Sequence, residues 1–392
     1  MKSKKRLIII HPFRLLENDF KRLELDYLKE NYELEIHDVL KINLNRKIQK
    51  YYKEPKIKNT IIFKNIVSWK NYMKDLLKLK KGNIFVMYVA IHYNFFFFET
   101  LRFCKKNNIK TIRFKTNPLP LIKIEINPFL LIFEKTLNFL LKPSFFFKMT
   151  IPTFFYTKLI NFFSLETDYI FASGEAKYNE LKNIENTRTK VIAFNSWDYS
   201  YFVRKKEKFL NEKKYAVFID DGSPGNFNDF SIYSKSPETI KTYYPLLNEF
   251  FTRLEKIFKV EIIIASHPKS YNDQKFFNNR KIVSFKTSEL VESSEFVITK
   301  YSSGLSFAVL SKKPILFFYT NEHSKFRRWL KMTKKIANLL GTKAFNISDD
   351  YSENFLKSLM KVDNDAYSKS ISNDMLLIRE KQNYKIIKEN IK

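Results

Sequence analysis

The segments YAVFIDDG (215–222), VEIIIASHPK (260–269) and EFVITKYSSG (295–304) share one pattern. Each begins with a short apolar run, rich in β-branched and aromatic residues, that stops at a polar group. Such runs are typical of buried strands that end in loops. Helical patterns separate the runs, so this stretch predicts a β-α-β-α-β unit with a parallel sheet. Because such sheets bind ligands just beyond the carboxyl ends of their strands, we expect the three polar groups to face one site.

The rest of the chain predicts a second α/β unit and a helical end. A length of 392 residues favours two domains over one. The pattern ends near residues 195–202, and a highly charged segment follows at 204–214. We therefore expect an N-terminal domain over 1–200, a second domain over 214–345 and C-terminal helices over 346–392, including one over 366–388. Strands of the first domain are predicted in the apolar runs at 7–10, 32–36, 84–90, 111–114, 169–172 and 191–194.

Composition limits the kinds of partner and the cellular compartment that we expect. The net charge of +29 indicates a polyanionic partner such as an anionic membrane, or simply an AT-rich coding bias, because Lys, Asn, Ile and Phe are all abundant. No zinc spacing or RNA-binding signature occurs, so nucleic acid is not expected. The single cysteine, Cys104, fits a reducing compartment and a buried, inert thiol. Residues 1–10 form a basic lead-in to a strand, too short for a signal core, so we expect a cytoplasmic protein.

An aromatic-rich insertion is predicted at 118–163. It is crowded with Phe, Leu and Ile and contains only two acids, Glu125 and Glu134, while several lysines interrupt it. No stretch reaches the roughly 18 consecutive apolar residues of a membrane-spanning helix. Apolar segments that carry lysine and many phenylalanines are typical of interfacial helices. The insertion therefore indicates either peripheral contact with the inner face of the cell membrane, or packing on the first domain or on a partner chain.

The acidic pair Asp220-Asp221 at the end of the first run is a candidate general base. A carboxylate at the edge of a cleft can take a proton from an attacking hydroxyl. In an extended segment neighbouring side chains point opposite ways, so only one of the two would face a substrate. The alternative interpretation is a turn, because Asp221-Gly222 is a common turn pair. Metal binding is a third interpretation, but no Asp-x-Asp pair ends a strand here, and we expect no metal.

His267 follows the second run within His267-Pro268-Lys269. An imidazole there could donate to a phosphate oxygen, Lys269 could add charge, and the proline fixes the turn between them. The alternative is a surface-loop histidine. His11 occupies a similar position after the first strand of the chain, so it is a weaker candidate for the same cleft.

Ser302-Ser303-Gly304 follows the third run, where either serine is predicted to cap a helix over 305–310. The free N–H groups of a helix start and its dipole favour an anion, and Gly304 would allow close approach of a phosphate. The alternative is ordinary serine capping. Lys300 and Gly222, beside these polar groups, are further candidates for the cleft. Another helix start is predicted at Ser236-Pro237-Glu238.

An acidic pair with glycine, then His-Pro, then Ser-Ser, in this order in the C-terminal half, resembles the motif set of bacterial sialyltransferases and polysialyltransferases. The run 286–317 is also similar to the donor-binding half of capsule and surface-polysaccharide transferases. The resemblance covers about a quarter of the chain. It implies a GT-B fold, with two Rossmann-like domains and a central cleft, and an inverting transfer of a CMP-activated acidic sugar without metal or added cofactor. The acceptor would be a glycan or a lipid-linked glycan.

The resemblance also implies a role for each motif. Asp220 or Asp221 would deprotonate the acceptor hydroxyl, His267 would stabilise or protonate the departing phosphate, and Ser302 and Ser303 would hold that phosphate. The same sequence is also compatible with three other functions. They are a glycerol-phosphate polymerase with a similar Ser-Ser helix start, a sugar-nucleotide 2-epimerase that would not need the aromatic insertion, and a non-catalytic GT-B scaffold that binds glycan or a partner.

Overall fold

The fold consists of two compact units, which are described separately. The computed structural model describes residues 4–12, 14–43, 49, 57–79, 84–90, 93–116, 151–183, 188–205, 208–222, 224, 238–267, 274–324 and 327–391. The first unit contains the described residues of Met1–Thr116, Glu125–Asn195 and Leu377–Lys392. The second contains the described residues of Ser196–Leu376. The helical end predicted as one region, 346–392, is thus divided between the two units.

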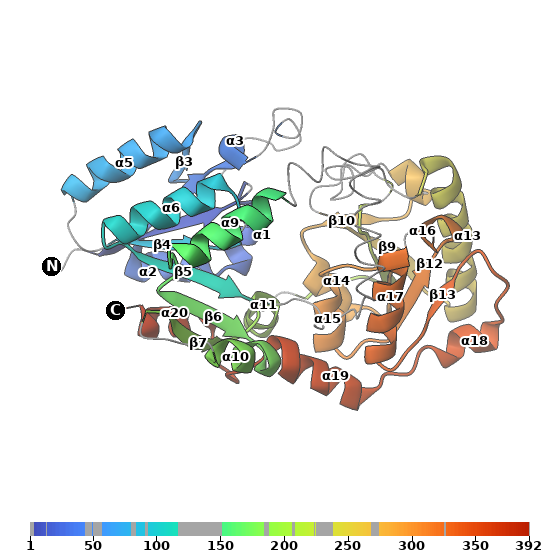
Figure 1. Ribbon diagram of the computed structural model, residues 1–392. Coiled ribbons are helices and arrows are strands. Elements are labelled where there is room, and N and C mark those ends of the chain that lie inside the picture. Colours follow the sequence, from blue (N-terminus) through green and yellow to red (C-terminus); the bar gives the residue numbers. More distant parts are fainter. Residues whose placement is uncertain are drawn as a thin grey trace. The chain divides into compact units, whose positions relative to one another are not determined.

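The first unit is built on a parallel sheet with the strand order β3-β2-β1-β4-β5-β6-β7 among the described residues (Figure 1). Every strand pair in it is parallel. Its strands are β1 (Lys5–His11), β2 (Tyr32–Asp38), β3 (Thr60–Ile62), β4 (Ile84–Tyr88), β5 (Lys110–Lys115), β6 (Tyr169–Ser173) and β7 (Lys190–Phe194). Its helices are α1 (Glu17–Arg22), α2 (Leu25–Asn31), α3 (Leu40–Asn43), α5 (Ile66–Leu79), α6 (Phe95–Lys106), α9 (Ile151–Phe162), α10 (Glu175–Lys182) and α20 (Asn383–Asn390).

Helices cover both faces of this sheet. Ile8 and Ile10 of β1 pack with α5, α6 and α9, whose buried side chains include Trp69, Phe97 and Ile160. Figure 1 shows these three helices together on one side of the sheet. On the other side, α2 contacts β2 and α20 packs against α2. Burial on both faces explains why the central strands β1 and β4 are continuous apolar runs in the sequence.

The second unit repeats this architecture with the strand order β10-β9-β8-β11-β12-β13, again parallel throughout the described strands. Its strands are β8 (Tyr215–Ile219), β9 (Glu261–Ser266), β10 (Ile282–Ser284), β11 (Val297–Thr299), β12 (Ile315–Tyr319) and β13 (Ala344–Asn346). Its helices are α11 (Trp197–Arg204), α13 (Ile240–Phe258), η2 (Gln274–Phe277), α14 (Thr287–Ser293), α15 (Leu305–Leu310), α16 (Asn321–Ser324), α17 (Arg327–Leu339), α18 (Glu353–Ser358), α19 (Asn364–Ser370) and the π-helix η3 (Ile371–Met375).

Alternate residues of β8 divide the core of the second unit. Ala216 and Phe218 pack under α13 and α18, while Tyr215, Val217 and Ile219 pack under α14, α15 and α17. Two Rossmann-like α/β units with parallel sheets confirm the predicted fold class. No helix in the described part of the chain is both long and apolar enough to cross a bilayer.

Several predicted elements differ from the structure. The helix predicted over 366–388 is instead α19, a π-helical turn and α20, with residues 376–382 between them outside any helix. The helix expected to begin at Ser236 begins at Ile240, where Thr239 is the N-cap and accepts from the backbone of Thr242. Ser236 and Pro237 lie outside the described residues. Most of the predicted insertion 118–163 does as well, and only its final part, which contains α9, is described.

Candidate functional site

The three polar groups predicted from the sequence follow three adjacent strands. β8 lies between β9 and β11, and all three are parallel, so their carboxyl ends share one edge of the sheet. Asp220 directly follows β8, and its backbone N–H donates to Ala265 of β9 at 3.1 Å. His267 directly follows β9, and Ser302 lies three residues beyond β11. The fold therefore brings these segments to the edge where such sheets bind their ligands.

Asp220 forms the turn after β8. Its side chain is only 2% exposed, and Oδ1 accepts the backbone N–H of Gly222 at 3.0 Å. Gly222 has a φ of 75°, a left-handed conformation that glycine adopts without the steric cost of a Cβ. Of the two acids, Asp220 is therefore the one whose side chain holds the turn.

Asp221 belongs to a buried charge cluster that sequence reasoning only partly found. Nζ of Lys300 lies 3.2 Å from Oδ2 of Asp221 and 2.6 Å from Oε2 of Glu238. The lysine side chain is 1% exposed, Glu238 is fully buried and Asp221 is 15% exposed. The ammonium group also lies 4.3 Å from the ring centre of Tyr243, and Thr320 donates to the other oxygen of Glu238 at 2.9 Å. Among these acids, Asp221 is thus the carboxylate that reaches the surface of the edge.

Burial and pairing set the electrostatics of the cluster. Burial raises the pKa of Glu238, against the effect of the adjacent Lys300. Burial alone would lower the pKa of Lys300, but Asp221 and Glu238 outweigh it and the pKa is raised. A buried cation is expensive unless it is paired and hydrogen-bonded, which explains why two carboxylates and an aromatic face surround this one. Lys300 is therefore a fixed charge that orients Asp221.

His323 of α16 completes the cluster. It is 3% exposed, and its backbone N–H donates to Oγ1 of Thr320 at 3.0 Å. Its Nε2 has no hydrogen-bond partner within the described residues. Burial, helped by the charge of Lys300, lowers its pKa to about 4 against the opposing effect of Asp221. The imidazole is thus neutral at pH 7.

The Ser302-Ser303-Gly304 segment does not cap α15 as predicted. The N-cap is Gly304, and no side chain accepts a capping bond there. Oγ of Ser302 instead accepts the backbone N–H of Gly304 at 3.3 Å, and Ser303 is exposed. A Cβ added at Gly304 would lie 3.3 Å from Ile219 and 3.2 Å from Thr287. The glycine therefore lets this loop pack closely against the end of β8.

The structure describes only some of the remaining predicted residues. His267 is partly exposed, and its carbonyl accepts Oγ of Ser266 at 3.4 Å. Pro268 and Lys269 lie outside the described residues. His11 ends β1 in the other unit, paired in register with Asp38. Within that unit, Asp38 forms a buried ion pair with Nε of Arg14 at 2.6 Å, which the sequence did not reveal.

Cys104 is buried, as expected, and the apolar surroundings raise the pKa of its thiol. Within the described residues, no group of three or more His, Cys, Asp or Glu side chains is arranged to hold a metal ion.

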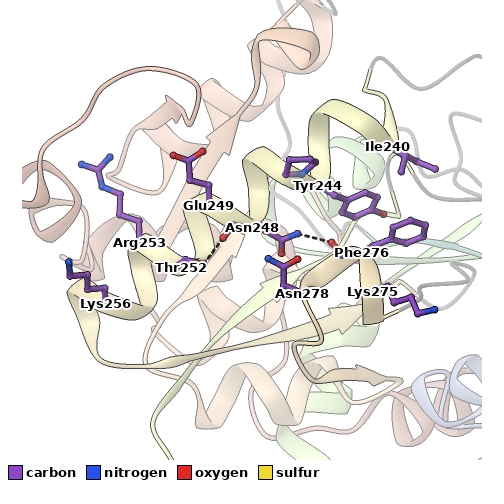
Figure 2. A pocket seen from close by; sticks show the side chains of 11 residues that line it. Ile240, Tyr244, Asn248, Glu249, Thr252, Arg253, Lys256, Lys275, Phe276 and Asn278 are labelled. Carbon is purple, nitrogen blue, oxygen red and sulfur yellow. Dashed lines mark hydrogen bonds between the residues drawn. The ribbon is translucent and has the colours of Figure 1, made fainter.

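A pocket of about 820 Å³ lies beside α13 and η2 (Figure 2). Figure 2 shows Tyr244 and Phe276 at one end, where their rings stack with centroids 4.8 Å apart, and Arg253 and Lys256 at the other. Asn248, between the two ends, donates to the carbonyl of Phe276 at 2.8 Å. None of the predicted site residues lines this pocket. It is therefore separate from the charge cluster, although Tyr243 of that cluster precedes Tyr244.

Sequence reasoning did not predict four members of the charge cluster, namely Glu238, Tyr243, Thr320 and His323. Glu238 was interpreted as part of a helix start, and no role was predicted for Tyr243. Thr320 directly follows β12, so the rule that polar groups at strand ends form sites could have found it. No local signal marks Glu238 as the partner of Lys300, because 62 residues separate them.

Comparison with solved structures places this fold among GT-B proteins, which have two Rossmann-like domains. A UDP-N-acetylglucosamine 2-epimerase matches with a TM-score of 0.50 and 13% identity over 99% of this chain and 95% of that one. The UDP-GlcNAc 2-epimerase of Neisseria meningitidis, bound to UDP-GlcNAc, matches with a TM-score of 0.50 and 12% identity over 98% and 99% of the two chains. At these identities the likeness shows the fold alone. No protein-family model and no curated protein matches the sequence.

Proposed function

We propose that this protein is an enzyme that acts on a nucleotide-activated sugar at the carboxyl edge of its second sheet. The observation that carries the proposal is the placement of Asp221, His267 and Ser302 after three adjacent parallel strands. The GT-B fold supports it, because two solved structures of this fold are named as enzymes of UDP-N-acetylglucosamine, and one of them holds that nucleotide sugar.

The reaction we propose is glycosyl transfer to a hydroxyl of a glycan or lipid-linked glycan. The acceptor oxygen forms a bond to the anomeric carbon of the donor as the bond from that carbon to the phosphate oxygen breaks. Asp221 takes the acceptor proton, and the nucleotide leaves with the bonding electrons. Asp221 is preferred over Asp220 because the side chain of Asp220 is almost fully buried in its turn.

The departing phosphate is assigned to His267, Lys269 and the Ser302-Ser303-Gly304 loop. An imidazole and an ammonium group would neutralise charge that develops on the phosphate, and hydroxyl groups would donate to its oxygens. Inversion, independence from metal and a CMP-linked acidic sugar are proposed from the resemblance of the motif set to bacterial sialyltransferases. Surface-polysaccharide assembly, as in capsule synthesis, is the proposed setting on the same ground.

Replacement of Asp221 tests the proposal. We expect Asp221→Asn to lower turnover of the accepted nucleotide sugar by about 10²–10⁴-fold, because the general base is lost, while affinity for the nucleotide is kept. Asp220→Asn, which retains an oxygen for the turn, is the matched control and should lose far less. The assay would follow released nucleotide and glycosylated acceptor by mass spectrometry.

The same assay distinguishes the competing functions. A new sugar epimer that stays attached to the nucleotide would replace the transferase with a 2-epimerase. Transfer of glycerol phosphate from a CDP-linked donor would identify a polymerase. Unchanged turnover in Asp221→Asn would remove Asp221 as the base.

A further inference from the structure

Helix α9 (Ile151–Phe162) exposes the face that a surface helix normally hides. Ile151, Phe154, Phe155 and Phe162 are 40%, 66%, 52% and 79% exposed. At positions i, i+3, i+4 and i+11 they form one stripe about 100° wide. Only Ile160, on the opposite side, is buried in the core of the first unit. The apolar face of α9 is thus the exposed one, and its aromatic rings point away from the core of the first unit.

Two neighbouring rings extend this stripe into a patch. Phe163 is 51% exposed and its ring centre lies 5.1 Å from that of Phe162. Phe95, at the start of α6, is also 51% exposed and lies beside Tyr156 of α9. The α9 patch is defined as Ile151, Phe154, Phe155, Phe162, Phe163 and Phe95. Contiguous exposed apolar surface of this kind marks a site of interaction.

Three cations, Lys158, Lys105 and Arg102, lie on α9 and α6 near the patch. Lys158 lies within the stripe, with Nζ 5.7 Å from the ring centre of Phe154. Lys105 of α6 donates to the carbonyl of Ser164 at the end of α9, at 2.9 Å, and Arg102 is 69% exposed. Residues 151–163 contain no acid. The only acid of α6, Glu99, is buried and pairs with Lys70 and, at 3.7 Å, with Arg102.

We propose that the α9 patch seats the first unit on an anionic lipid bilayer. Aromatic and aliphatic side chains with interspersed lysine suit the boundary between headgroups and acyl chains, where the rings enter the apolar layer and the ammonium groups meet phosphate. A helix of 12 residues is about 18 Å long, shorter than the ~30 Å hydrocarbon core, so it lies in the plane of the interface.

A second copy of the chain fits the patch less well. In a two-fold dimer the same surface meets itself, so the patch with Lys158 and Arg102 would face a second copy of the same cations. Like charges at such a contact are unfavourable, and a chain with a net charge of +29 adds to the repulsion. The bilayer is therefore the occupant to which the charges are complementary. This inference does not depend on the proposed enzymatic activity.

Co-sedimentation with vesicles tests the role of the rings. Wild-type protein should bind phosphatidylcholine vesicles that contain phosphatidylglycerol. The variant Phe154→Ser/Phe155→Ser/Phe162→Ser should bind about 100-fold more weakly, because three apolar groups no longer enter the bilayer. The matched control Val203→Ser/Leu210→Ser/Leu339→Ser removes three side chains of the second unit that are 50%, 88% and 46% exposed, and it should bind like wild type.

A second pair of variants tests the charges. Lys158→Gln/Arg102→Gln should weaken binding to the anionic vesicles by about 10-fold or more, at roughly 1 kcal/mol for each cation near the surface. Lys29→Gln/Lys361→Gln removes the same net charge from exposed positions away from the patch and should have a much smaller effect.

Three results would overturn the proposal. They are no binding of wild type to anionic vesicles, equal binding by the Phe triple variant and its control, and a wild-type dimer that the triple variant converts to a monomer without any vesicle binding. The last would assign the patch to a second copy. Circular dichroism would verify folding of each variant, and nucleotide binding by the Phe triple variant should equal that of wild type, which separates this test from that of the enzymatic proposal.

Discussion

At the residue scale, the central feature of the candidate site is Lys300, which is buried between Asp221 and Glu238. Desolvation of three charges is expensive, and an apolar core at this place would be at least as stable. Such groups are often found where a protein needs a charge of fixed position. On the proposed function, that charge holds Asp221 at the edge of the sheet.

His323 provides a test of the cluster that needs no substrate. Its pKa is lowered from 6.5 to about 4 in the folded protein, mainly by burial. The unfolded chain therefore takes up the proton first as the pH falls, and the stabilisation present above pH 6.5 is lost toward pH 4. At pH 5 this loss amounts to about 2 kcal/mol relative to pH 7.

His323→Gln should remove that pH dependence. The difference in the free energy of unfolding between wild type and variant, measured by urea denaturation, should be constant above pH 7 and fall by about 2 kcal/mol at pH 5. A difference that stays constant from pH 7 to pH 5 would show that the imidazole is not shielded as the structure has it.

Sequence reasoning found the edge of the site but not its interior. Asp221, His267 and Ser302 could be predicted to lie at one edge of the sheet because each follows a recognisable buried strand, and parallel strands end at a common edge. The rest of the charge cluster could not, because Glu238 and His323 come from two other places in the chain and no local pattern links either of them to Lys300. Two other predicted residues have structural explanations. The side chain of Asp220 holds the turn after β8, and Gly304 allows close packing against Ile219 and Thr287.

At the element scale, strands such as β1, β4 and β8 could be predicted well because they are buried on both faces and form apolar runs in the sequence. The three-residue strands β3 and β13 were missed, whereas β11, which is equally short, was predicted. Helix ends were less predictable, because a cap depends on which side chain reaches the free backbone groups. Thr239 does so for α13, whereas the predicted Ser302 and Ser303 do not for α15.

A buried amide, Asn195, is one of the groups that hold the chain end on the first unit. Oδ1 of Asn195 accepts the backbone N–H groups of Leu377 and Ile378 at 3.0 and 2.9 Å. Its Nδ2 donates to the carbonyls of Ile378 and Lys381 at 2.8 and 2.9 Å. Asn383 at the start of α20 in turn pairs with the backbone of Asn195.

Asn195→Ala should therefore destabilise the first unit by about 2–4 kcal/mol, because several partly buried backbone groups lose their partner. Hydrogen exchange should show faster exchange in residues 377–391 before the sheet itself opens. Asn390→Ala, which removes a single bond to the carbonyl of Ile386 in its own helix, is the control and should cost less than about 0.5 kcal/mol. Equal exchange in the two variants would contradict this role for Asn195.

At the scale of the whole molecule, each unit carries a different proposed task. The first presents the α9 patch and the second presents the edge with Asp221 and His267. The net charge of +29 is compatible with both, since a lipid surface and a nucleotide phosphate are anions. A glycan acceptor that is anchored in a lipid would bring both tasks to one substrate.

The central claim, that the edge of the second sheet binds the phosphate of a nucleotide, is tested most directly by thermal denaturation. Wild type, His267→Ala and Asp221→Asn would be screened against CMP, CDP, UDP, GDP and their sugar conjugates, with and without magnesium. A ligand at 100 times its Kd stabilises the folded state by about 2.7 kcal/mol, which raises Tm by roughly 5–10 °C. We expect one nucleotide to do so for wild type and for Asp221→Asn, and to do so much less for His267→Ala. A shift with CMP in the absence of magnesium would support the CMP-linked donor, and a shift with UDP or CDP would change the donor class. If no nucleotide raises the Tm of wild type, or if His267→Ala responds as wild type does, the proposed site is contradicted.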